Sequence, residues 1–292
     1  MFNFTLYKRG MKESYKMLLI FAAVLTMYFS VIIYMFDPAF NDVLNQFAQT
    51  MPQLMSLFGM NPISTTLVGF ISAYLYGFIM LLFPMLFSII SANRLIARHV
   101  DRGSMTYLLA APVNRKTVVF TQIGVLITGI FGLIIFATIL GLAISAMAFP
   151  NQLDIGRFLL LNFGALCLHL FIGGVCFACS CIFDDSRRSI GVGAGICIFQ
   201  YVLQMLANTG DKLENIKYLT FFTLFNSDGI VMGELFSIVG LIVLLVCAVI
   251  LFGVSIKIWF ICIYVHISIK QVLLLYYLIF ILYLSYIITI IG

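Results

Sequence analysis

The chain has 292 residues, of which 63% are hydrophobic and only 9% are charged, and its mean hydropathy is +1.14. Because soluble domains carry about 25% charged residues, this composition excludes a soluble globular protein and predicts an integral membrane protein. The net charge of +5 is small and lies in membrane-flanking segments, so it indicates no nucleic-acid partner.

Residues 2–16 precede the first long apolar run and mix basic with apolar side chains. The basic residues of this segment are Lys8, Arg9, Lys12 and Lys16. The mixture is typical of an amphipathic helix at the membrane interface; a disordered basic tail that only sets topology is the alternative. The run that follows is too long for a secretory signal and lacks a small-residue cleavage site, so we expect a retained anchor.

Apolar runs of about 20 residues or more predict six membrane-spanning helices. The predicted spans are Met17–Phe36, Thr66–Ile90, Val118–Phe149, Phe158–Phe183, Ser189–Ala207 and Leu235–Ile256. Residues 37–65 contain no Lys or Arg, and residues 208–234 form a polar loop. In this arrangement, twelve of the sixteen Lys and Arg residues fall on the side of the membrane opposite to these two segments. Positive charge favours the cytoplasmic side, so a cytoplasmic N-terminus is predicted.

The connection between the second and third spans, residues 91–117, is the most basic part of the chain. Its Lys and Arg residues are Arg94, Arg98, Arg102, Arg115 and Lys116. Ser104 is a good helix N-cap, and Asp101 places negative charge near the positive end of the helix. Pro112 ends this helix within about two turns.

Met105, Leu108 and Leu109 have the i, i+3, i+4 spacing that gives this short helix one apolar face. Such a helix, basic at both ends, suits docking into a groove on a soluble protein. A helix lying on lipid headgroups is equally compatible with the periodicity.

Residues that could carry chemistry are few. His169 is the one ionisable group well inside the predicted spans and marks a possible intramembrane polar site, although a neutral histidine bonded across helices is the favoured interpretation. No metal-ligand spacing is visible, and no G-x-x-x-x-G-K-[ST] occurs, so a partner must supply any ATP energy. Small residues are predicted to bring the fourth and fifth spans together. They are Gly173, Gly174, Gly191 and Gly195.

Residues 258–292 differ in composition from the rest and contain neither Ala nor Met. Residues 271–291 are long enough for a seventh span, which would place the C-terminus outside. The break in composition leads us to the hypothesis that a frameshift altered this tail. We therefore expect a main domain over residues 1–257 and an atypical hydrophobic tail over 258–292.

The order of these parts resembles the permease subunits of ABC-2-type ABC transporters, in the exporter-like group with six spans. The resemblance rests on the loop motif and covers about residues 1–257. The matching residues are Asp101-x-Gly103-Ser104, Leu108-Leu109, Pro112 and Arg115. It implies an all-α polytopic fold with an N-terminal amphipathic elbow helix and a cytoplasmic coupling helix between spans 2 and 3.

The resemblance also implies a division of labour. The chain would be a non-catalytic permease of a bacterial cell membrane, paired with a second identical or different permease subunit. Its coupling helix would contact a cytoplasmic ABC ATPase, which holds the ATP and Mg²⁺, so no cofactor is expected on this chain. Drugs, antimicrobial peptides, lipids or similar amphipathic molecules would be exported.

Two other functions remain open at this stage. A secondary transporter driven by an ion gradient usually has acidic residues or broken helices near the membrane midplane, and no Asp or Glu lies deep in a predicted span. A membrane sensor without transport activity would need a polar cluster at one membrane face, and only the charged turn at residues 184–188 comes near that.

Overall fold

The computed structural model describes most of the six predicted spans and the segments between them. The described residues are 2–36, 46, 49–59, 66–97, 115–183, 185–209 and 214–264. Six helices among them are long and apolar enough to cross a membrane. The fold is therefore an all-helical, multi-pass membrane protein, as predicted.

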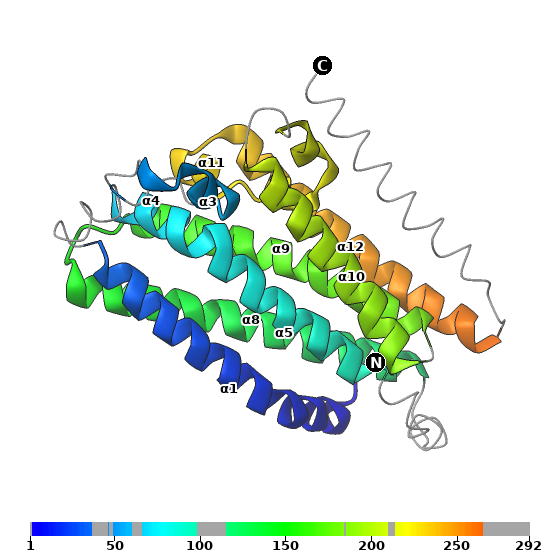
Figure 1. Cartoon of the computed structure of the whole chain (residues 1–292). Coiled ribbons are helices and arrows are strands. Elements are labelled where there is room, and N and C mark those ends of the chain that lie inside the picture. Colours follow the sequence, from blue (N-terminus) through cyan, green and yellow to red (C-terminus); the bar gives the residue numbers. More distant parts are fainter. Residues whose placement is uncertain are drawn as a thin grey trace.

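The six long helices run side by side as one bundle (Figure 1). Span 1 is α1 (Phe4–Tyr34), and span 2 consists of α4 (Leu67–Ile71), a π-helix (Ser72–Ile79) and α5 (Met80–Leu95). Spans 3 to 6 are α8 (Arg115–Ala148), α9 (Ile155–Ile182), α10 (Ser186–Ala207) and α12 (Leu235–Tyr264). At one end lie α3 (Pro52–Leu57), two 3₁₀-helices (Glu214–Leu219 and Phe221–Leu224) and α11 (Ser227–Met232).

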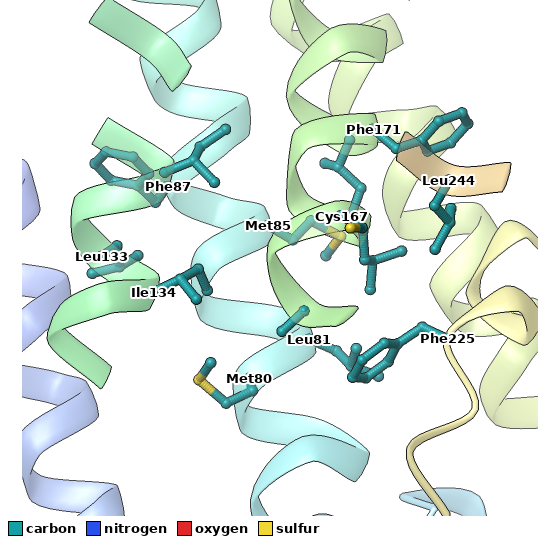
Figure 2. Packing of buried hydrophobic residues seen from close by; sticks show 14 of the residues in the cluster. Met80, Leu81, Met85, Phe87, Leu133, Ile134, Cys167, Phe171, Phe225 and Leu244 are labelled. Carbon is teal, nitrogen blue, oxygen red and sulfur yellow. The ribbon is translucent and has the colours of Figure 1, made fainter. Parts of the chain in front are cut away.

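Helix α9 is the centre of the bundle. In its most apolar window 83% of the residues are buried, against 28% for α1 and 22% for α10. It packs against α5, α8, α10 and α12. Figure 2 shows Met85 of α5 and Cys167 of α9 within this core, with Leu133 on α8 and Leu244 on α12 in the same cluster. The outer helices α1 and α10 therefore present apolar faces to lipid or to another subunit.

Helix α1 is continuous from Phe4 to Tyr34, so the predicted interfacial segment and the first span form one helix. The disordered-tail alternative is thus wrong for residues 4–16. At 1.5 Å per residue this helix is about 46 Å long, longer than the ~30 Å hydrocarbon core. Its four basic residues are exposed, as an interfacial position requires. A separate elbow helix stays a prediction.

The chain between spans 5 and 6 is more structured than the predicted polar loop. We call residues 214–233 the cap. Phe221, Phe222 and Phe225 of the cap are buried, and they pack on the bundle through contacts with α10 and α12. Asn226 caps α11 by accepting a hydrogen bond from the Gly229 amide. Aromatic burial therefore fixes this segment against the helices.

Two glycines allow backbones to approach closely where the cap end is assembled. A Cβ atom on Gly77 would lie 2.8 Å from the Phe58 carbonyl oxygen, and one on Gly240 would lie 2.6 Å from that of Leu224. Real Cβ atoms do not approach so closely. Glycine at 77 lets span 2 meet the end of α3, and glycine at 240 lets α12 meet the cap.

The glycines predicted to join spans 4 and 5 have other neighbours. Gly173 faces Ile130 of α8, and Gly174 faces Leu251 of α12. Gly191 and Gly195 have open space beside them, so that part of the prediction was wrong. Gly193, which faces Cys176 and Cys179, makes the contact between α10 and α9 instead.

The last described helix passes the predicted end of span 6 at Ile256 and continues to Tyr264. Residue 257, the predicted domain boundary, therefore lies inside α12. The proposed seventh span, residues 271–291, lies outside the described residues.

A substitution at Gly240 tests the close contact between α12 and the cap. Gly240→Ala should lower the free energy of unfolding by about 1–3 kcal/mol, because the new methyl group meets a backbone oxygen that cannot move independently. Thermal unfolding of the purified protein measures this effect. Gly253→Ala on the same helix is the matched control, since its side is open. Equal melting temperatures for the two variants would contradict the contact.

Candidate functional site

The residues of the predicted coupling helix, 101–112, lie outside the described residues. Arg115 is the first residue of α8, and only its backbone is described. The structure therefore shows the two anchors of this loop, which are the end of α5 and the start of α8. We call this end of the bundle the loop end and the opposite one the cap end.

The end of α5 is tied to two other elements at the loop end. Arg94 donates from Nη2 to the Glu13 carbonyl oxygen of α1 at 3.2 Å. Asn93 donates from Nδ2 to the Ser186 hydroxyl at the start of α10 at 2.9 Å. The start of α10 is in turn capped by Asp185, which accepts from the Arg187 amide. The end of span 2 is thus hydrogen-bonded to span 1 and to the start of span 5.

The N-terminal part of α1 is attached to α8. The Asn3 amide donates to the Thr121 hydroxyl at 3.2 Å, and the Tyr7 hydroxyl donates to that of Thr128 at 3.1 Å. Gly10 lies against Val125, where a Cβ atom would be 2.9 Å from a valine methyl group. The basic segment is therefore packed along the span that follows the loop.

His169 lies fully buried on α9, and its Nε2 atom is 2.7 Å from the Met80 carbonyl oxygen. A carbonyl can only accept, so Nε2 carries the proton. Met80 lies four residues before Pro84, which has no amide proton to offer it. His169 supplies the hydrogen bond that the proline removes, and the favoured interpretation of a histidine bonded across helices is confirmed.

Further polar contacts follow span 2 toward the cap end. The Tyr76 hydroxyl donates to Asn162 Oδ1 of α9 at 2.7 Å, and both side chains are buried. One turn further, the Ser72 hydroxyl donates to Asp228 Oδ1 of α11 at 3.3 Å. The π-helix therefore carries polar groups from the core of the bundle to the cap.

A cavity of about 230 Å³ lies where the π-helix, α3, α10 and the cap meet. Polar and aromatic side chains line it, among them Tyr76, Tyr201, Gln204 and Asp228. A second cavity of about 440 Å³ adjoins it and shares Gln204 as well as other lining residues. Sequence reasoning missed this site, because its residues are spread over spans 2 and 5 and the cap. The one signal was the aromatic run at 221–225 within an otherwise polar loop.

Comparison with known families identifies the fold. The model of the ABC-2 family transporter protein matches residues 4–220, well over half of the chain. The chain belongs to this family. It is therefore the permease of an ABC transporter, a membrane component of a kind that is generally non-catalytic. The match covers the first five spans of this ABC-2 permease and part of its cap. A search of curated proteins gave no match.

The role of His169 can be tested with a double-mutant cycle. His169→Leu should cost about 1–3 kcal/mol of stability, because the buried Met80 carbonyl loses its donor. Adding Pro84→Ala restores a backbone amide at the regular i+4 position and should recover most of the loss. Thermal unfolding of the four proteins in detergent gives the coupling energy.

A positive coupling between the two substitutions supports the structural role of His169. If His169→Leu keeps normal stability but abolishes transport, His169 is a transport residue instead.

Proposed function

We propose that this ABC-2 permease is the membrane subunit of an exporter driven by a separate cytoplasmic ATPase. The observation that carries the proposal is the loop motif at residues 101–115, placed between spans 2 and 3 of a chain in this family. The chain has no P-loop, so ATP and Mg²⁺ are held by the partner and this chain binds no cofactor of its own.

The loop anchors support a coupling role for this segment. Arg94 and Asn93 connect the end of α5 to α1 and α10. A displacement of the loop by the ATPase would therefore be transmitted to helices on both sides of span 2. Side-chain hydrogen bonds at the ends of packed helices transmit such displacements because the helices themselves are stiff. We infer that Met105, Leu108 and Leu109 enter an apolar groove of the ATPase.

Charge supports a cytoplasmic loop end in a bacterial cell membrane. Lys8, Arg9, Lys12 and Lys16 are exposed at this end, and Arg187 and Arg188 are exposed beside them at the start of α10. The positive-inside rule places such residues in the cytoplasm. The N-terminus is then cytoplasmic, and the cap faces outward.

Exposed apolar faces support pairing with a second permease subunit. On α10 the exposed side chains include Ile198, Phe199 and Val202, next to the open sides of Gly191 and Gly195. Small residues allow close helix contacts in membranes. A pathway between two such subunits suits a drug, an antimicrobial peptide, a lipid or a similar amphipathic substrate.

A secondary transporter is disfavoured among the alternatives. His169, the ionisable group predicted deep in the membrane, is engaged by the Met80 carbonyl. Its Nε2 atom is therefore occupied, and no Asp or Glu lies deep in a predicted span to bind a coupling ion.

Substitutions in the predicted coupling helix test the proposal. The double variant Leu108→Asp with Leu109→Asp should reduce stimulation of the partner ATPase about tenfold or more, because a carboxylate in an apolar groove is costly to bury. Co-purification and ATPase assays of the reconstituted complex measure this loss.

Ala110→Asp adds one carboxylate to the opposite side of the predicted helix and serves as the control. Normal co-purification and normal stimulation with the Leu108 and Leu109 variant would show that the coupling assignment is wrong.

A further inference from the structure

We propose that the cap-end cavity is a binding site for an organic cation, a substituted ammonium group carrying an apolar or aromatic part. The inference concerns a ligand site within one subunit. It goes beyond the proposed function and does not depend on ATPase coupling.

The cavity is built by elements that are distant in sequence. The π-helix contributes Tyr76 and Gly77, α10 contributes Tyr201 and Gln204, and α11 contributes Asp228. Gly77 lets the backbone of residues 58 and 59 close one side, since any side chain there would collide with it. The walls are thus set by backbone contacts and helix packing, which gives the cavity a defined shape.

Tyr201 indicates that the cavity accepts a ligand. The residue is only 5% exposed, and its hydroxyl has no hydrogen-bond partner among the described residues. Its ring is fixed between Phe78 and Phe222, at centroid distances of 6.3 and 5.4 Å. A buried hydroxyl without a partner costs about 1–3 kcal/mol, and a ligand in the cavity that Tyr201 lines would supply the missing partner.

Charge decides which ligand fits. Asp228 is the one charged residue among the described residues that line this cavity, and its carboxylate accepts a hydrogen bond from Ser72. Lys217 belongs to the adjoining cavity, where its ammonium lies 5.2 Å from the centroid of the Tyr218 ring. A carboxylate that lines a cavity attracts a cation and repels an anion.

The aromatic lining favours an organic cation over a metal ion. Tyr76, Tyr201, Phe222 and Phe225 surround the cavity. Aromatic faces attract ammonium groups, and the attraction is strongest where the cation has lost its water. A single carboxylate with neutral amides is too few hard ligands for a divalent metal, which takes six or more oxygens. The amide of Gln204 can bind polar parts of the same ligand.

The test uses full-length permease in nanodiscs of zwitterionic lipid, which hold no anionic lipid to attract cations. Radiolabelled benzyldimethylammonium, which has one N–H donor for the Tyr201 hydroxyl oxygen, is the probe in equilibrium dialysis, and phenylmethanesulfonate is an anion of similar size for competition. The wild-type protein should bind the probe saturably, with one site per chain. The anion should not displace it.

Three variants locate the site. Asp228→Asn should weaken binding about tenfold by removing the charge, although asparagine still accepts the hydrogen bond from Ser72. Tyr201→Phe should weaken it about threefold, through loss of one hydrogen bond. Asp154→Asn is the matched control: its carboxylate is exposed, lies outside the cavity and caps α9, a role that asparagine also performs.

Lack of saturable binding to the wild-type protein would overturn the proposal. So would equal affinity for Asp228→Asn and Asp154→Asn, or displacement of the probe by the anion. If Asp228→Asn fails to fold, as judged by its melting temperature, Tyr201→Phe decides the question, and unchanged binding by that folded variant refutes the site.

Discussion

The structure depends on one constraint, which is that backbone polar groups inside a bilayer must find partners within the protein. Span 2 challenges this requirement at Pro84, which offers no amide proton to the Met80 carbonyl. Helix α9 supplies the missing donor through His169, and its Asn162 also accepts a hydrogen bond from the Tyr76 hydroxyl of the π-helix. These bonds fix span 2 against α9, the buried helix at the centre of the bundle.

The π-helix of span 2 also gives the cap end its shape. A π-helix changes the direction of the side chains beyond it, and here it directs Ser72 and Tyr76 toward the cap and α9. Gly77 then admits the end of α3, and Gly240 admits the cap on the other side. The cap-end cavity thus depends on the π-helix of span 2 and on Gly77 within it. The loop end is held more simply, by side-chain bonds from Arg94 and Asn93 to α1 and α10.

Much of the fold follows from the sequence, because long apolar runs have few alternatives in a membrane. The start of α10 and the end of α9 lie within a few residues of the predicted span limits. Long-range partners could not be predicted: the acceptor of His169 lies 89 residues away, and the neighbours of Gly191 and Gly195 depend on the rotation of α10. The cap was missed because a short aromatic run in a polar loop shows its burial only when the bundle is assembled. The short helix between spans 2 and 3 stays a prediction from its own residues, and its coupling role stays a prediction from the family resemblance.

Orientation in the membrane is the central claim of the account, because the proposed function places the loop end in the cytoplasm beside an ATPase and the cap end outside. Labelling of single cysteines with a membrane-impermeant maleimide measures it directly. Met232→Cys lies in the cap and Arg188→Cys at the start of α10, and both native side chains are exposed. In intact cells the reagent should label Met232→Cys above the background of the parent protein, and label Arg188→Cys only after the membrane is permeabilised. Labelling of Arg188→Cys alone in intact cells would contradict the account.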